Sequence, residues 1–211
     1  MLRSTRLAPP QFQSPCRPSP VAAPPAGPGW LHEIKHDGFR LMVRRDEARV
    51  QAFTRKGHDW AARFPAVAAA AIALRASSFL IDSEVVAADA AGLASFNLLR
   101  QRRHRKGAFC WAFDLLELEG RDLRREPIEH RKVELTRLLK GAPFGLAFNE
   151  HHEGDGPPLF AEACRRGLEG IVSKPAGSHY RSGPSTDWLK AKNPASPAAR
   201  REAIEDWAKH R

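Results

Sequence analysis

The stretch Glu33-Ile34-Lys35-His36-Asp37-Gly38-Phe39-Arg40 decides how the chain is interpreted. Its dipeptide Asp37-Gly38 is a strong signal for a tight turn. The run 39–43 has the residue types of a strand, in which alternate side chains face opposite sides. The pattern therefore predicts a strand, a tight turn and a second strand, with Lys35 just before the turn.

The surroundings of Lys35 are those of a nucleophile. An ammonium group cannot attack until it loses a proton, and both desolvation and neighbouring cations favour that loss. Trp30, Leu31 and Ile34 can desolvate Lys35, and Arg40 can add positive charge. For this motif alone, a solvated lysine on a surface hairpin is an equal alternative, so the interpretation depends on further motifs.

Five further motifs follow along the sequence. In order they are Thr54-Arg55-Lys56-Gly57, Asp82-Ser83-Glu84-Val85-Val86, Phe113-Asp114-Leu115-Leu116, Glu169-Gly170-Ile171-Val172-Ser173-Lys174 and Trp188-Leu189-Lys190-Ala191-Lys192. Lys190 and Lys192 lie two positions apart in a strand-like run, so their side chains share a face and can reach one phosphate group. The same spacing puts Glu33 on the face of Lys35. For two such lysines alone, a solvated strand face is the alternative.

From about residue 24 to residue 192, the six motifs resemble the adenylation domain of ATP-dependent DNA ligases. These enzymes are covalent nucleotidyltransferases, as are RNA ligases and mRNA capping enzymes, and the resemblance is strongest to the ligase domain of bacterial multifunctional end-joining ligases. It implies that Lys35 attacks the α-phosphate of ATP, that pyrophosphate leaves, and that the lysine carries AMP as a phosphoramidate. The AMP would then move to a DNA 5′-phosphate, and a 3′-hydroxyl would displace it.

The resemblance also implies a role for each motif residue. Glu33 would accept a hydrogen bond from the adenine amino group, and Phe113 would stack on the base. Both Glu84 and Glu169 would serve Mg²⁺, which prefers carboxylate oxygens, and Glu84 would also hold the ribose hydroxyl. The cations that would hold the ribose and phosphates of ATP are Arg40, Arg55, Lys174, Lys190 and Lys192. Taken singly, Phe113 would be a core residue and Glu84 a solvated one.

The charge of the chain favours a polyanionic partner. With 34 Lys and Arg against 24 Asp and Glu, the net charge is +10, which suits phosphate contacts that weaken as salt rises. A short helix expected at 96–99 leads into the densest basic run, which comprises Arg100, Arg102, Arg103, Arg105 and Lys106. We expect this run to contact DNA or the triphosphate, with a solvated helix end as the alternative.

The cysteines and the hydropathy predict the compartment. Cys16, Cys110 and Cys164 form no C-x-x-C pair and leave one cysteine over in any disulfide scheme, which indicates a reducing compartment and no zinc site. No run approaches the roughly 18 apolar residues of a membrane span. Since the resemblance is to bacterial enzymes, we expect a bacterial cytoplasmic protein without membrane contact.

The pattern of segments predicts an α+β fold. Strands are expected at 30–35, 39–45, 49–54, 79–88, 109–118 and 145–151, and helices at 65–75, 128–139 and 158–166. The absence of a repeating βαβ period favours antiparallel sheets with flanking helices. The resemblance implies the nucleotidyltransferase (ATP-grasp-like) catalytic domain of ligases and capping enzymes, with the nucleotide held between two sheets.

Three parts of the chain are expected. Residues 1–28 hold eight of the seventeen prolines, which predicts an extended or disordered arm without regular structure. Residues 29–193 form the adenylation domain, and residues 194–211 carry a last helix at about 198–210. Only about twenty residues follow Lys192, whereas full ligases continue into an OB-fold domain. We therefore expect a protein partner that supplies an OB-fold or end-binding function, besides broken or nicked DNA.

Two residues depart from the family pattern, and two other functions stay open. Pro175, directly after Lys174, removes one backbone donor and stiffens the loop. Ser83 stands where the family has glycine, and it would be strained if that position needs a positive φ. The first alternative function is a catalytically weak nucleotide- or DNA-binding protein that assists a full-length ligase. The second is an RNA ligase or capping-type transferase.

Overall fold

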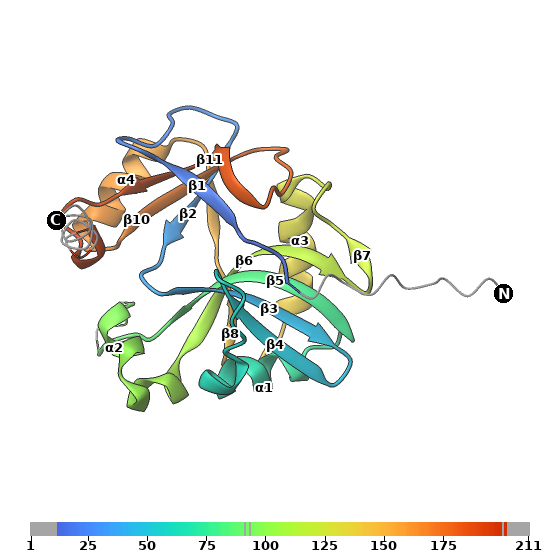
Figure 1. Cartoon of the computed structure of the whole chain (residues 1–211). Coiled ribbons are helices and arrows are strands. Elements are labelled where there is room, and N and C mark those ends of the chain that lie inside the picture. The colour runs from blue at the N-terminus through green and yellow to red at the C-terminus, as the bar shows by residue number, and fades with distance from the viewer. Residues whose placement is uncertain (1–11, 91, 93, 200, 202–211) are drawn as a thin grey trace.

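The framework consists of two sheets with helices against them (Figure 1). The computed structural model describes residues 12–90, 92, 94–199 and 201. All sheet pairings within this part are antiparallel except two, the parallel pairs of β1 with β11 and of β6 with β8. The predicted α+β class with antiparallel sheets and flanking helices is confirmed.

The five-stranded sheet contains the first and the last strand of the described chain. Its order is β1 (Cys16–Val21), β11 (Gly183–Lys192), β10 (Gly170–Pro175), β2 (Trp30–Lys35) and β9 (His151–Glu153). Three of the six sequence motifs therefore lie on neighbouring strands of one sheet, although up to about 150 residues separate them in the chain.

The six-stranded sheet carries the remaining motifs. Its order is β4 (Arg49–Thr54), β3 (Phe39–Asp46), β5 (Ser78–Val86), β6 (Phe109–Leu118) and β7 (Arg121–Asp122), and β8 (Leu146–Phe148) pairs with β6. The predicted strand at 145–151 is wrong as a single element. It is divided between β8 and β9, which belong to different sheets.

The helices lie against both sheets. Pro65 begins α1 (Pro65–Ala73), whose buried Val67, Ala70 and Ala71 join the main core on the six-stranded sheet. Helix α3 (Ile128–Leu139) packs on β6 and β8, and α4 (Gly156–Arg165) packs on β10 and β2. The short elements are η1 (Ala61–Arg63), α2 (Phe96–Arg100) and η2 (Arg102–Gly107). The predicted helices at 65–75, 96–99, 128–139 and 158–166 are confirmed.

The two strands around the turn at Asp37-Gly38 do not form a hairpin. β2 pairs with β9 and β10, whereas β3 pairs with β4 and β5, so the turn carries the chain from one sheet to the other. The backbone at Gly38 comes so close to β5 that a Cβ atom there would lie 2.1 Å from the carbonyl oxygen of Val85. The predicted strand bounds are right, and the surface-hairpin alternative is wrong.

The proline-rich arm contains a strand. Residues Cys16–Val21 form β1, which pairs in parallel with β11, so the expectation of no regular structure is wrong there. β1 lies at the edge of its sheet. Proline has no backbone N–H to donate, and an edge strand loses fewer hydrogen bonds through this than a central strand, so Pro18 and Pro20 are tolerated there. Residues 1–11 lie outside the described part. The boundaries at 28/29 and 193/194 stay predictions.

Two further expectations concern single sites. Among the described residues other than glycine, positive φ angles occur at Glu47 and Glu119 and not at Ser83. The Ser83 hydroxyl donates a 2.8 Å hydrogen bond to the carbonyl of Leu41, so the expected strain is absent. Of the predicted helix at 198–210, positions 198, 199 and 201 are helical, and 200 and 202–211 lie outside the described residues. Within the described part, no helix is long and apolar enough to cross a membrane.

Replacing Gly38 should destabilise the protein. A methyl group in Gly38→Ala would overlap the Val85 carbonyl, and relieving that overlap by moving β3 from β5 should cost about 1–3 kcal/mol of unfolding free energy. Urea denaturation measures the loss. Gly107→Ala is the matched control, because a Cβ there meets nothing within 4 Å. Equal stability of the two variants would contradict the close-approach explanation.

Candidate active site

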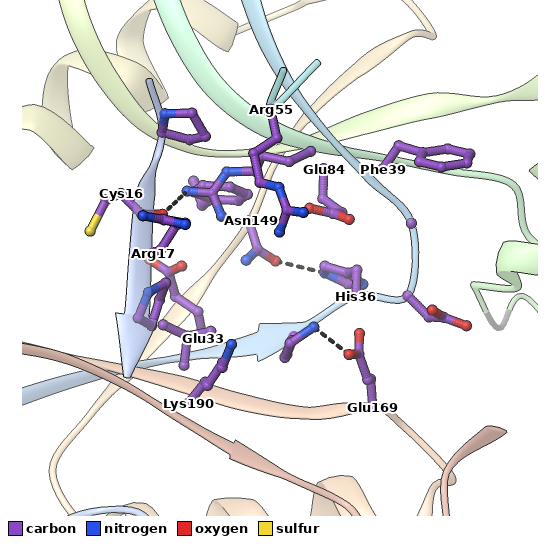
Figure 2. Close-up of a pocket in the computed structure, with 18 of the residues that line it drawn as sticks. Cys16, Arg17, Glu33, His36, Phe39, Arg55, Glu84, Asn149, Glu169 and Lys190 are labelled. Atoms are coloured by element: carbon purple, nitrogen blue, oxygen red, sulfur yellow. Dashed lines mark hydrogen bonds and ion pairs between the residues drawn. The ribbon is translucent and has the colours of Figure 1, made fainter. Parts of the chain in front are cut away.

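A cavity of about 570 Å³ lies between the two sheets (Figure 2). Its lining comes from the strands of both sheets, from the loop after β4 and from the turn that joins β2 to β3. Its size falls in the range of small-molecule and cofactor sites. Ten sequence-predicted residues line this one cavity, namely Glu33, Lys35, Arg40, Arg55, Glu84, Phe113, Glu169, Lys174, Lys190 and Lys192.

Lys35 and Glu169 form an ion pair at one wall of the cavity. They meet because Lys35 lies opposite Gly170 in the pairing of β2 with β10. Gly170 has φ +144°, and a Cβ there would lie 2.1 Å from the carbonyl oxygen of Ala191, so the close fit of β10 on β11 requires glycine. Burial raises the pKa of Glu169, although Lys35 opposes the shift.

Glu33 binds two lysines at the inner end of the cavity. Its Oε1 atom lies 2.8 Å from Nζ of Lys174 and 2.5 Å from Nζ of Lys132. All three side chains are buried. Burial favours the neutral form of Glu33, but the two lysines outweigh it and lower the pKa of this carboxyl. Lys174 also lies 4.3 Å from the Trp188 ring centroid and 5.0 Å from that of Phe113, so an aromatic wall surrounds the cluster.

Sequence reasoning missed Lys132. It follows Arg131 on α3, and Arg131 forms a buried two-point ion pair with Asp114 of β6 at 2.7 and 2.9 Å. That pair fixes α3 so that the next side chain reaches Glu33. A signal was present in the sequence, because position 132 falls on the apolar stripe formed by Ile128, Leu135 and Leu139. A lysine on such a stripe needs a buried partner.

Arg40 is fixed from three sides. Its Nε and Nη2 atoms lie 2.5 and 2.7 Å from the two oxygens of Asp82, and Nη2 donates to the carbonyl of Cys16 at 3.3 Å. Tyr180 donates to Asp82 at 2.6 Å and accepts from the Cys16 backbone at 2.8 Å. The guanidinium carbon lies 4.4 Å from the Phe113 ring centroid. Arg40 thus joins both sheets and is held rigidly.

Glu84 faces the cavity from β5, and Figure 2 shows the Arg55 side chain reaching toward it. Burial raises the pKa of Glu84 to about 8, while Lys35 and Arg40 act to lower it and Glu169 and Asp82 to raise it. Glu84 and Glu169 are therefore two desolvated carboxyl groups that repel each other across the cavity.

These carboxyl groups fit a bound Mg²⁺. This ion is commonly held by one or two carboxylates together with waters and substrate phosphates, and it would relieve the repulsion between Glu84 and Glu169. The described residues contain no group of three or more His, Cys, Asp or Glu side chains that could hold a metal without the substrate.

Sequence reasoning missed three further residues near Lys35 and the turn at Asp37-Gly38, which we call the nucleophile turn after the role predicted for Lys35. Nε2 of His36 donates a 2.9 Å hydrogen bond to Oδ1 of Asn149, and burial lowers the pKa of His36 to about 4. Arg201 forms an ion pair with Asp37 at 2.5 Å. Arg17 of β1 also lines the cavity. No short sequence motif marks Asn149, Arg17 or Arg201, because long-range strand pairing and chain termini bring them to the site.

The predicted nucleic-acid residues lie outside the cavity lining. Arg100 ends α2, and the others belong to η2, where the side chains of Arg102, Arg103 and Lys106 are exposed. Arg105 is partly committed to the carbonyls of Leu99 and Arg100, at 3.2 and 3.3 Å. The run is thus a surface feature outside the cavity lining, and its contact with DNA or the triphosphate stays a prediction.

Comparison with known proteins decides the family. The family model described as ATP dependent DNA ligase domain matches residues 20–192. This chain belongs to the ATP-dependent DNA ligase domain family. The multifunctional non-homologous end joining protein LigD of Pseudomonas aeruginosa is 37% identical over 187 residues, which cover 87% of this chain and 22% of LigD. The resemblance inferred from the six motifs is confirmed.

Two solved structures share the fold of this ligase domain. The ligase domain of LigD from Mycobacterium tuberculosis superimposes with a TM-score of 0.75 at 29% identity, covering 86% of this chain and 61% of that chain. A mycobacterial DNA ligase D complexed with ATP and MES gives 0.74 at 30% identity, covering 86% and 60%. The chain thus spans about a fifth of the length of the LigD protein and three fifths of these solved domains.

Removing the charge of Glu33 should strongly destabilise the ligase domain. In Glu33→Gln the ammonium groups of Lys132 and Lys174 stay buried without a counter-charge, which should cost about 3–5 kcal/mol of unfolding free energy. Urea denaturation gives the value. Glu153→Gln is the control on the neighbouring strand, where the side chain is 75% exposed. If both variants lose the same stability, the cluster does not hold the site together.

The raised pKa of Glu84 should make stability fall with rising pH. Between the ordinary value of 4.5 and about 8, the folded protein keeps a proton that the unfolded chain has lost, so the free energy of unfolding decreases through this window. Glu84→Gln removes this dependence and should be about 1–3 kcal/mol more stable than the parent at pH 8, after allowance for partial exposure.

Urea midpoints measured from pH 5 to pH 8 for the parent and Glu84→Gln provide the test. Glu150→Gln, in which an exposed carboxyl is removed, is the control and should follow the parent curve. Parallel curves for the parent and Glu84→Gln would show that Glu84 does not carry the effect.

Proposed function

We propose that this ligase domain forms a covalent lysyl-AMP at Lys35 and transfers the AMP to a DNA 5′-phosphate for strand joining. The observation that carries the proposal is the convergence of six distant motifs on one cavity, with the Lys35 ammonium held by Glu169 at its wall. The chain spans only part of its relatives, so the activity and the DNA substrate are both parts of the proposal.

The inner end of the cavity suits adenine. Both lysines contact the same oxygen of Glu33, Oε1, so Oε2 can accept a hydrogen bond from the adenine amino group. Lys132 and Lys174 lower the pKa of Glu33 and so favour its ionised form, in which the carboxylate only accepts hydrogen bonds. Phe113 offers a ring for stacking beside Arg40. In this arrangement Lys174 contacts Glu33 and also lines the cavity, and its expected role at the phosphates stays a prediction.

The wall with Lys35 suits the transfer step. The Lys35 ammonium first gives up one proton and becomes an amine. Nζ then attacks the α-phosphorus, an N–P bond forms as the bond to the leaving pyrophosphate oxygen breaks, and the nitrogen releases its second proton to solvent. Glu169 Oε1 contacts Nζ and can take the first proton, because burial raises the pKa of the carboxyl. The same contact aims the nucleophile.

Cationic side chains line the part of the cavity in which the phosphates of ATP would lie. Arg55 is exposed at the mouth of the cavity, and Lys190 and Lys192 both line it from β11, as their spacing predicts. Fixed cations stabilise the charge of the transition state without reorganising. Glu84 and Glu169 would hold Mg²⁺, which would neutralise charge on the phosphates and on the leaving pyrophosphate.

Transfer of α-phosphate label from ATP should depend on Lys35. The parent, incubated with Mg²⁺ and α-labelled ATP, should carry label that survives denaturing electrophoresis, and Lys35→Ala should carry less than about one hundredth of it, since no other side chain replaces the nucleophile. Lys140→Ala removes a surface lysine and should label like the parent. An unlabelled parent, or an equally labelled Lys35→Ala, would refute the proposal.

Two additions separate the alternative functions. A chase of the labelled protein with nicked DNA or nicked RNA identifies the acceptor, and competition between ATP and GTP tests a capping-type transferase. Binding of ATP and DNA without any covalent label would instead support the accessory protein.

A further inference from the structure

A row of aromatic side chains leads from the nucleophile turn to the surface. His36 stacks on Trp111 with ring centroids 5.0 Å apart and planes at 11°. Trp111 contacts Phe109 at 5.2 Å, and Phe109 contacts Phe144 at 5.7 Å. We call these four side chains the aromatic track.

The track lies on the same face of the six-stranded sheet as Arg40 and Glu84, which line the cavity. In the six-stranded sheet, Arg40 pairs with Glu84 and Glu84 pairs with Trp111, and directly paired residues project from the same face. Phe109 lies two positions from Trp111 on β6 and shares that face. A ligand strand that ends at Lys35 can therefore leave the cavity along these rings.

The outer end of the track is unusually open. Phe144 is 63% exposed, more than any other large apolar side chain in the described part of the chain. Its ring packs on Phe109 and stands outside the buried core cluster. Because burying a phenyl ring is favourable, the exposed Phe144 ring offers apolar area to a partner that stacks on it.

Positive charge lies beside the same end. The segment 96–108 contains five Arg and Lys and no Asp or Glu. It leads directly into β6, and the amide of Ala108 bonds to the carbonyl of Arg105 at 3.3 Å, which fixes η2 next to Phe109. Phe144 is the exposed ring of the track, and an exposed ring beside cations that attract phosphates is a combination by which proteins bind unpaired nucleotides.

We propose that the aromatic track is a stacking surface for unpaired bases of the nucleic-acid strand whose end reaches Lys35. This inference rests on the proposed function for its choice of partner. Paired bases in an intact duplex keep their faces covered, so the track selects DNA with a single-stranded overhang or gap over a fully paired duplex. The cations of η2 contact the phosphates of either form.

Binding of labelled oligonucleotides tests the track without catalysis. Fluorescence anisotropy in EDTA without ATP compares a blunt duplex with the same duplex carrying a short single-stranded overhang. The parent should prefer the overhang. Phe144→Ala should weaken overhang binding about tenfold and leave blunt-duplex binding unchanged, because stacking is lost and phosphate contacts are kept.

Three further variants make the result specific. Phe144→Trp should keep the preference, and Phe144→Leu should lose it, since leucine has apolar area but no ring face. Val133→Ala, on α3 with 46% exposure, is the matched surface control and should bind like the parent. The three Phe144 variants and Val133→Ala should all show the urea midpoint of the parent within error.

Salt separates stacking from charge. The factor by which Phe144→Ala weakens overhang binding should be equal at 50 and 200 mM salt. A double variant, Arg102→Ala with Arg103→Ala, should instead bind both duplexes with a smaller dependence of affinity on salt.

Three results would each overturn the proposal. They are equal overhang binding by Phe144→Ala and Val133→Ala, equal losses of affinity on both duplexes, and an overhang preference retained by Phe144→Leu. An acidic peptide serves as the competitor. If the peptide does not displace the overhang DNA, the proposal is supported. If the parent binds the peptide more tightly than the overhang DNA, the track is assigned to a protein partner instead. The label assay with Lys35→Ala reads the proposed function separately.

Discussion

The close contact of the Gly38 backbone with β5 is the constraint on which the site depends. It lets the chain leave one sheet and enter the other within three residues, at a separation that a Cβ atom would prevent. Lys35 ends the strand before this turn and Arg40 is the second residue of the strand after it, so the two sheets bring Lys35 and the fixed arginine to one cavity. Gly170 makes a second close approach, to Ala191 of β11, and lies opposite Lys35 in the five-stranded sheet, which brings Glu169 against Lys35.

Buried charge organises the rest of the cavity. Glu33 has two lysines, Asp82 has Arg40, and Asp114 has Arg131, so each of these carboxylates is compensated in the protein itself. Such pairs contribute little net stability, since desolvation offsets attraction, but losing one partner is costly and the geometry is therefore held. Glu84 differs, because burial raises its pKa to about 8 despite its cationic neighbours. A carboxyl in this state is ready to gain a cation together with the substrate.

Local elements were predictable because their signals are local. The bounds of β2 and β4 agree with the run of β-branched and aromatic residues between turn signals, and α1 begins at the proline that favours a first helical turn. The predictions failed where pairing partners decide the structure. β1 forms despite its prolines because it needs only one neighbour, and the segment 145–151 breaks in two because its halves join different sheets.

The sequence alone predicted the family and ten of the residues that line the cavity, because their chemistry requires particular residue types at short spacings along strands. Tertiary structure alone decided that Lys132 supports Glu33, that Arg40 is held by Asp82, and that Phe109, Trp111 and Phe144 line up beside the nucleophile turn. These relations join residues far apart in the chain. Packing of α3 on β6 and the crossing between two sheets create them, and no local pattern records the distance across such contacts.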